Sequence, residues 1–251
     1  MSPKIFSPEE KDAREQEMLG CAKLIIRDEG LAGLTIDKLV KQLPYSKGTV
    51  YNHFSSKEDI MLAICTEHMQ QIGEIMARAL TFNGNSREKA LAVHVGSMLN
   101  SQAYPDDFMI GVSVKSAGCT SKASEFRRLK HQQIEMAFLA PIFAHFRSAA
   151  EAGESIVPAG MCIEQMAFSC WSADFGVQTL LMGDNDACSI RSQLNVETEL
   201  LNSINLIHDG MCWQPLAKDF DWKASVERIK TEIFSAEVEI ISQLQTSLNT
   251  L

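Results

Sequence analysis

The residues of this 251-residue chain that are best suited to bind another molecule cluster in one segment, which runs TIDKLVKQLPYSKGTVYNHFSSK. Lys47 can reach the acceptor atoms of guanine or a phosphate, and the methyl group of Thr49 can pack on thymine. Together with Tyr51, these side chains fall on one side of a short predicted helix. Val50 and Phe54 fall on the opposite side, where they can face a core. We therefore expect the outer face of this helix to recognise DNA.

The elements predicted around this helix form a helix-turn-helix. Thr35 is a favourable N-cap for a first helix, whose apolar residues recur at helical spacing. Pro44 ends that helix, because proline lacks a backbone donor and disfavours the helical conformation of the residue before it. Ser46 can cap the second helix, predicted over residues 47–53. Two helices separated by about four residues, the second with exposed donors, are typical of this motif.

The charge of this segment differs from that of the whole protein. The chain has 23 basic and 32 acidic residues, a formal net charge of −9. Between Lys38 and Lys57 there is no aspartate or glutamate, and Lys41 and Lys47 add further positive charge. A local cationic patch suits the DNA backbone, because neutralised phosphates release counterions. The alternative is that the four lysines form only a solvated basic face.

The string SKGTVYNHF at residues 46–54, with SKE at 56–58, resembles the TetR family of bacterial transcription regulators. The resemblance implies that Lys47, Gly48 and Thr49 approach the bases. It also implies that four side chains hold phosphates, namely those of Thr35, Tyr51, His53 and Lys57. Ser46 and Asn52 lie in the same motif and complete the set of candidate DNA-binding residues.

The resemblance covers about residues 17–64, whereas the rest of the chain matches the family only in length and helical character. Pro44 and Tyr45 depart from the family, which usually has a glycine and a small hydrophobic residue in this turn. The departure predicts a more rigid turn.

Apolar periodicity predicts an all-α protein with two domains. Residues 1–66 hold nine basic and ten acidic groups and are predicted to form a three-helix DNA-binding domain. Residues 67–251 carry the remaining charge of −8 and are predicted to form a larger helical bundle for ligand binding and dimerisation. Ser55 followed by Glu58 has the pattern of a capping box, which would open a helix that continues towards Leu80 as a rigid connection.

Two helices predicted at 158–182 and 192–209 are apolar over more of their surface than a single core can cover. One face can meet the core of the domain, and the other can meet a partner subunit; the alternative is full burial within one chain. The family resemblance places a four-helix dimer interface here. We expect a two-fold symmetric homodimer and therefore a palindromic operator. A narrow apolar stripe predicts one further helix over 222–248.

A small, mainly apolar effector is expected inside the bundle formed by residues 80–182. The candidate core residues of this region are methionines, aromatic residues and isoleucines with few polar groups, as in many ligand pockets. The candidate ligand contacts are Phe108, His131, Met166 and Trp171.

Several classes of protein are disfavoured. The chain has no G-x-S-x-G, no H-E-x-x-H and no phosphate loop, so we expect neither an enzyme nor a cofactor. Seven scattered cysteines without a C-x-x-C pair are expected to be small buried hydrophobic residues rather than disulfides or metal ligands. No apolar run reaches about 18 residues, and the N-terminus lacks the apolar core of a signal peptide. We therefore expect a cytoplasmic protein that does not span a membrane.

These features predict a sequence-specific DNA-binding transcription regulator, a repressor that a small effector releases from its operator. The competing hypothesis is an all-α module that binds a ligand or a protein and in which the helix-turn-helix is incidental.

Overall fold

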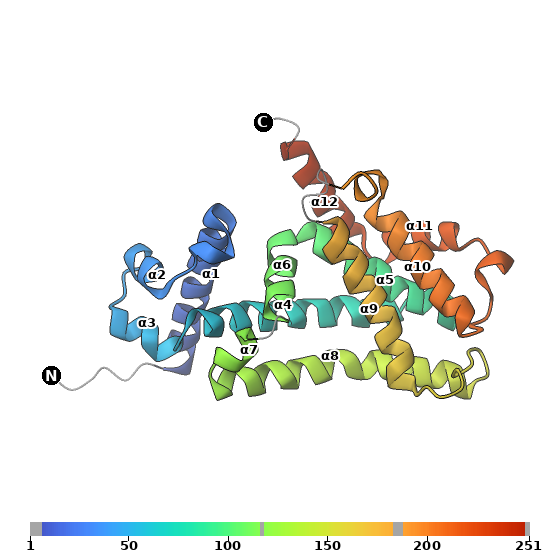
Figure 1. The fold of residues 1–251 in the computed structure, drawn as a ribbon, viewed down its shortest axis with the longest axis horizontal. Coiled ribbons are helices and arrows are strands. Elements are labelled where there is room, and N and C mark those ends of the chain that lie inside the picture. The colour runs from blue at the N-terminus through green and yellow to red at the C-terminus, as the bar shows by residue number, and fades with distance from the viewer. Residues whose placement is uncertain (1–6, 116–117, 183–187, 249–251) are drawn as a thin grey trace. The chain divides into compact units, whose positions relative to one another are not determined.

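The computed structural model of the protein describes residues 7–115, 118–182 and 188–248 (Figure 1). Within these ranges the chain forms helices joined by turns, without a strand, so the predicted all-α class is confirmed. None of the described helices is both long and apolar enough to cross a membrane. The chain divides into two compact units. Unit 1 joins the chain up to His68 with Asp106–Ile134, and unit 2 joins Met69–Pro105 with the chain from Glu135 onward.

Unit 1 contains the predicted helix-turn-helix. Its elements are α1 (Pro8–Gly33), α2 (Ile36–Gln42), α3 (Lys47–His53), the first part of α4 (Lys57–Leu80), α6 (Pro105–Val114), α7 (Cys119–Lys122) and the first part of α8 (Glu125–Glu151). The core of the unit gathers apolar side chains from distant parts of this set, including Leu39 of α2, Val50 of α3 and Ile110 of α6.

The start of α1 is set by local hydrogen bonds. The Ser7 hydroxyl accepts from the Glu10 amide at 3.2 Å, and the Glu10 carboxylate accepts from the Ser7 amide at 2.9 Å. This reciprocal pair is a capping box, which satisfies two amides that have no partner within the helix. Near the other end, Gly30 leaves the helical conformation with a φ of 73°, which is accessible to glycine without steric cost.

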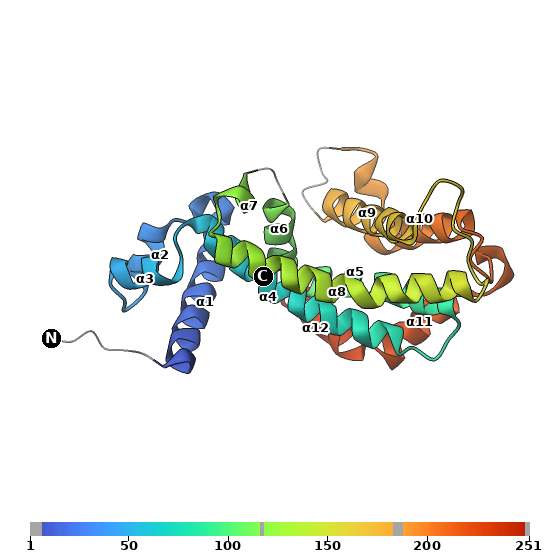
Figure 2. The ribbon, with the colours of Figure 1, turned by 90° about the horizontal axis from the view of Figure 1, so that it is seen from below.

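Unit 2 is a helical bundle built on α5 (Ser86–Ala103). The helices α9 (Ile163–Leu181) and α10 (Val196–Gly210) pack side by side and each contacts α5 (Figure 1 and Figure 2). The two last helices, α11 (Trp222–Glu232) and α12 (Ser235–Leu248), also pack on α5 and on each other. The second parts of α4 and α8 complete the unit, and short 3-10 turns lie at Arg191–Gln193 and Ala217–Asp219.

The prediction of a single helix over 222–248 was wrong. The chain leaves the helix after Glu232 and begins α12 at Ser235, which allows Phe234 to be fully buried. The ring of Phe234 lies against Gly96 of α5, where an added Cβ would come within 2.7 Å of its Cζ atom. The close packing of this ring therefore accompanies a break in the helix that the continuous apolar stripe had predicted.

The two units divide the chain differently from the two predicted domains. The first break lies two residues beyond the predicted boundary at 66, but residues 106–134 pack with the N-terminal helices rather than with the bundle. Because α4 and α8 each contribute residues to both units, two continuous helices connect the units. The assignment of DNA binding to 1–66 and of ligand binding and dimerisation to 67–251 stays a prediction.

Candidate nucleic-acid interface

The helix-turn-helix is held at its helix starts by the two predicted caps. The Thr35 hydroxyl accepts a hydrogen bond from the Lys38 amide at 3.2 Å at the start of α2. The Ser46 hydroxyl accepts from the Thr49 amide at 3.2 Å at the start of α3. Each bond satisfies an amide in the first helical turn that would otherwise lack a partner. The predicted start of both helices is thereby confirmed.

The face of α3 turned away from the core carries the predicted DNA-binding side chains. Val50 and Phe54 are fully buried, whereas Tyr51 is 46% exposed. The other members of the candidate set on this helix and its cap are exposed or half-buried, namely Ser46, Lys47, Gly48, Thr49 and Asn52. The structure therefore places these residues as expected, and their contact with DNA stays a prediction.

Two of the four lysines of the basic patch are paired with carboxylates. Lys47 lies 2.6 Å from Asp37 of α2, and Lys38 forms an ion pair with Glu29 of α1. The hydrogen bond from Lys47 lowers the pKa of Asp37, and the same bond raises the pKa of Lys47. Asp37 lies just before the segment from Lys38 to Lys57 that contains no acidic residue. In the sequence, only the short turn between α2 and α3 indicated that Asp37 could lie close to Lys47.

The turn that departs from the family pattern is tied to α1. The phenol of Tyr45 donates a hydrogen bond to the carboxylate of Glu17, and the guanidinium of Arg14 lies 5.5 Å from the centre of the Tyr45 ring. A cation over the face of an aromatic ring is attracted by the ring quadrupole. The tyrosine thus replaces the small residue of the family pattern with an anchor to the first helix.

His53 lies differently from the other candidate residues. Its ring is mostly buried, with Nδ1 3.5 Å from Glu15 Oε2, and its backbone oxygen accepts from Arg127 Nη2 at 3.3 Å. Arg127 Nη1 also lies 2.7 Å from Glu15 Oε1, and its guanidinium lies 4.8 Å from the centre of the Phe54 ring. The sequence did not identify Arg127, because it is distant along the chain from both partners.

The start of α4 is capped one residue later than predicted. The Ser56 hydroxyl accepts from the Asp59 amide at 3.1 Å, and the Asp59 carboxylate accepts from the Ser55 amide at 2.8 Å and from the Ser124 amide at 2.6 Å. Burial alone would raise the pKa of Asp59, but these hydrogen bonds outweigh it and leave the pKa below its usual value. The predicted capping box of Ser55 and Glu58 was therefore wrong. The buried Asp59 makes the capping hydrogen bonds instead, and its carboxylate also accepts from the distant Ser124 amide.

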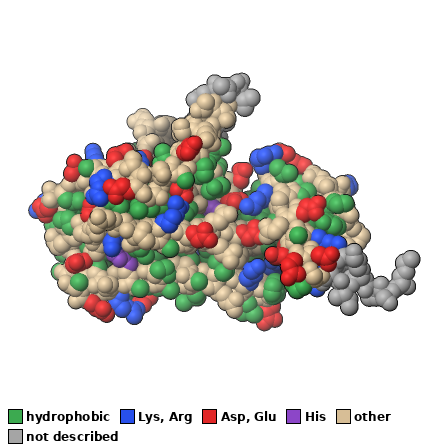
Figure 3. Space-filling model, turned by 180° about the vertical axis from the view of Figure 1, so that it is seen from behind, with side chains coloured by type: hydrophobic (Ala, Val, Ile, Leu, Met, Phe, Trp, Pro, Cys, Tyr) green, Lys and Arg blue, Asp and Glu red, His purple; other side chains and the backbone are tan. Residues whose placement is uncertain are grey.

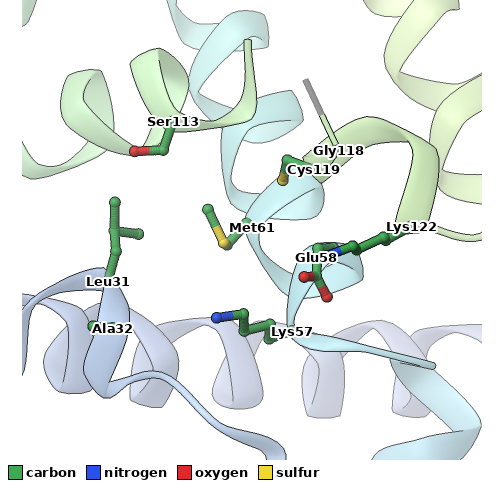
Figure 4. Close-up of a pocket in the computed structure, with 9 residues that line it drawn as sticks. All are labelled: Leu31, Ala32, Lys57, Glu58, Met61, Ser113, Gly118, Cys119 and Lys122. Carbon is green, nitrogen blue, oxygen red and sulfur yellow. The ribbon is translucent and has the colours of Figure 1, made fainter. Parts of the chain in front are cut away.

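Lys57 begins α4 and lines an open groove of about 320 Å³ within unit 1 (Figure 4). The close-up shows side chains from α1, α4, α6 and α7 around it. The lining residues are Leu31, Ala32, Lys57, Glu58, Met61, Ser113, Gly118, Cys119 and Lys122.

The four candidate effector contacts do not come together within either unit. Phe108 and His131 belong to unit 1, where His131 Nδ1 lies 3.0 Å from the Thr66 hydroxyl. Met166 and Trp171 belong to α9 of unit 2; Met166 is fully buried and Trp171 is 39% exposed. Their role in ligand binding stays a prediction.

Residues 22–64 match the sequence family described as bacterial regulatory proteins of the tetR family. Over 73 residues the chain is 32% identical to the HTH-type transcriptional repressor AcnR of Corynebacterium diphtheriae. That stretch is 29% of this chain and 38% of AcnR, so the match spans well under half of this curated relative.

Solved structures extend the likeness to most of the chain. The TetR family transcriptional regulator PfmR from Thermus thermophilus has a TM-score of 0.57 at 17% identity, covering 76% of this chain and 97% of PfmR. The transcriptional regulator FadR from Bacillus subtilis, solved in complex with stearoyl-CoA, has a TM-score of 0.57 at 19% identity, covering 78% and 98%. The helix-turn-helix segment at residues 22–64 is therefore similar to that of the TetR family, and the fold of the chain is similar to those of solved regulators of this family.

Proposed function

We propose that this protein is a homodimeric transcription regulator that binds an inverted-repeat DNA site through α3. The observation that carries the proposal is the orientation of a capped α3, which turns Lys47 and Tyr51 outward while Val50 and Phe54 anchor it in the core. A short helix held in this way can enter the major groove and present its first residues to base edges.

Two of the four residues proposed to hold phosphates lie at helix starts. Thr35 is the N-cap of α2, and Lys57 is the first residue of α4. Backbone amides and the positive end of the helix dipole favour anions at such positions. Lys57 adds a full positive charge. Phosphate contacts at two helix starts would fix the register of α3 on the duplex without reading sequence.

The operator can be selected from random double-stranded DNA, and three alanine variants then test the assignment of roles. We expect Lys47→Ala or Thr49→Ala to weaken operator binding about 5- to 150-fold and to relax the preference at one base pair. Lys57→Ala should weaken binding to all DNA sequences by a similar factor. It should also reduce the slope of log binding constant against log salt concentration by about one unit. Lys11→Ala, a change of charge at an exposed site of α1, is the control.

Two outcomes would contradict this assignment. One is that the selection enriches no DNA sequence, and the other is that Lys47→Ala and Thr49→Ala both bind the operator with wild-type affinity. The chain would then be better described as a helical module that binds a ligand or a protein.

The ion pair of Lys47 with Asp37 implies competition between this carboxylate and DNA. Because Asp37 also places a negative charge beside the proposed phosphate contacts, its removal should favour binding. We expect Asp37→Asn to raise operator affinity by a factor of about 1.5–5, the range that exposed ion pairs supply. Titration of labelled operator measures the change, and Asp12→Asn on α1 makes the same change of charge elsewhere. Weaker binding by Asp37→Asn would show instead that the carboxylate orients Lys47 for recognition.

The proposed dimer uses the outer faces of α9 and α10. These faces expose large apolar side chains, among them Phe168 at 59% and Leu206 at 73%. Phe168 packs edge-on against Trp171, with ring centres 5.7 Å apart. An aromatic and aliphatic surface of this kind is typical of the buried centre of a protein interface. Two α3 helices related by the dimer axis would meet half-sites about 34 Å apart, or a multiple of that distance.

A charge in this surface should separate the subunits. We expect Phe168→Glu to be monomeric at micromolar concentration and to lose operator binding, because burial of an unpaired carboxylate opposes association. Sedimentation analysis gives the mass, and circular dichroism reports whether the helices persist. Phe126→Glu, at an exposed phenylalanine of α8 in unit 1, is the matched control and should stay dimeric. A wild-type protein that sediments as a monomer would refute the dimer.

We further propose that a small, mainly apolar effector weakens operator binding, which makes the regulator a repressor that its ligand releases. Support comes from the fold shared with FadR, whose structure contains stearoyl-CoA, and from the two helices that are continuous between the units. The effector would favour a state in which the paired α3 helices no longer match the spacing of the major groove.

A thermal-shift screen of neutral and acidic apolar molecules, including long-chain acyl thioesters, can identify ligands. We expect a hit to lower operator affinity about 5- to 150-fold, and DNA to lower ligand affinity by the same factor. Met166→Ala should reduce ligand affinity, with Met136→Ala, at an exposed position of α8, as the control. Ligands that bind tightly yet leave operator affinity unchanged would exclude this switch.

A further inference from the structure

Three potential metal ligands meet inside unit 2, away from the helix-turn-helix. They are His94 of α5, Cys170 of α9 and His208 of α10. One ligand atom from each lies within 4.8 Å of the other two, and all three residues are buried. The centres of the two imidazole rings are 6.1 Å apart. Residues far apart in the sequence thus place two ring nitrogens and one sulfur around a common point.

His208 is the member of this cluster whose polar atoms are unsatisfied within the residues that the structure describes. The residue is fully buried, and neither of its ring nitrogens has a hydrogen-bond partner in the described part of the chain. The ring lies near that of Trp213, with ring centres 4.9 Å apart. Buried polar groups in native proteins are nearly always satisfied by protein, water or an ion. An orphaned imidazole beside a second imidazole and a thiol therefore indicates an occupant.

His94 is already oriented in the manner of a metal ligand. Its Nδ1 atom lies 2.6 Å from Asp174 Oδ2. The same carboxylate accepts from the Ser97 hydroxyl at 3.0 Å and from the amide nitrogen of Gln178. An imidazole that donates from Nδ1 to a carboxylate presents the lone pair of Nε2 to a metal, and such outer carboxylates are a regular feature of metal sites. The hydrogen bonds to Asp174 fix the position of this carboxylate.

We propose that His94, Cys170 and His208 bind one Zn²⁺ ion, with Asp174 as the residue that positions His94. Two imidazoles and a thiolate are borderline-to-soft ligands, a set that suits zinc and does not suit Mg²⁺ or Ca²⁺, which require oxygen ligands. Three protein ligands leave a fourth tetrahedral position for solvent or another donor.

Metal binding would draw the three ligand atoms together. Zinc bonds of about 2.0–2.3 Å imply ligand atoms about 3.3–3.6 Å apart in a tetrahedron, so atoms up to 4.8 Å apart must approach by as much as about 1.2–1.5 Å. Burial raises the pKa of the Cys170 thiol to about 12, so metal binding must displace its proton, which leaves to solvent. The dipositive ion, the thiolate and the Asp174 carboxylate then sum to zero charge, which suits a buried site.

Zinc at this point would join α5, α9 and α10, the three helices that pack together in unit 2. Because the ion would bind the folded bundle and have no equivalent site in the unfolded chain, it should stabilise unit 2. Zinc binding at this site would not require DNA binding.

The test uses the metal-free full-length protein with Cys162→Ser and Cys212→Ser, which remove the two exposed cysteines. Titration with Co²⁺ should give one equivalent of bound metal, visible d–d bands of tetrahedral intensity and a thiolate-to-metal charge-transfer band. Zn²⁺ should displace the cobalt and raise the thermal midpoint. The absence of a charge-transfer band, or of a saturating equivalent, would overturn the proposal.

Variants of the cluster locate the site. We expect Cys170→Ala to abolish the charge-transfer band and Asp174→Asn to weaken metal binding about 10- to 100-fold while keeping the band. Cys119→Ala, at a buried cysteine of unit 1, is the matched control and should bind cobalt as tightly as the Cys162→Ser, Cys212→Ser protein does. If circular dichroism shows that Cys170→Ala does not fold, the proposal is tested by two other measurements. These are the cobalt spectrum of the Cys162→Ser, Cys212→Ser protein and the metal affinity of Asp174→Asn. Unchanged binding in Asp174→Asn and Cys170→Ala would mean that the metal binds other residues, which refutes the site.

Discussion

Within unit 1, the buried guanidinium of Arg127 connects elements that are far apart in the sequence. It pairs with Glu15 of α1, donates to the backbone oxygen of His53 at the end of α3 and lies over the ring of Phe54. Loss of Glu15 would leave the buried guanidinium of Arg127 without its ion pair, which is destabilising. The position of α3 therefore depends on a residue at the start of α8 as well as on its own core contacts. Asp59 makes a second connection of this kind, since its carboxylate accepts from the Ser124 amide just before α8.

Two of the lysines around α3 are paired with carboxylates. In the free protein Lys47 pairs with Asp37 and Lys38 with Glu29, so the local patch is less positive than its lysines alone imply. Acidic and basic side chains are also interspersed on the face shown in Figure 3. Exposed ion pairs contribute little to stability, so in the proposed complex a phosphate or guanine would replace a carboxylate at low cost. The carboxylates of Asp37 and Glu29 would weaken the binding of DNA of any sequence. Base contacts would then supply a larger share of the affinity for a specific site.

Unit 2 combines an apolar core with two buried polar clusters. Arg87 of α5 is fully buried and donates to Asp209 at 2.6 Å and to the backbone oxygen of Trp213 at 2.7 Å. These partners lie on α10 or directly after it, so this network fixes α10 against α5. In the cluster that contains His94, the Asp174 carboxylate of α9 bonds His94 and Ser97 of α5, so this cluster fixes α9 against α5. The helices whose outer faces are proposed to form the dimer are thus held on their inner faces by polar contacts of defined geometry, which specify one arrangement more strictly than apolar packing does.

The sequence by itself determined the features that depend on neighbours within about four residues. The caps at Thr35 and Ser46 and the outward face of α3 follow from local hydrogen bonds and helical spacing, so they were predictable. Only the tertiary structure decided which residues from distant segments meet. Asp59 rather than Glu58 caps α4 because Asp59 is the one buried beside α8, and Phe234 interrupts a predicted helix because its ring fits against α5. The cluster around Cys170 was equally invisible in the sequence, because a metal site requires side chains from three helices to converge, and helical periodicity specifies the face of each helix but not its partners.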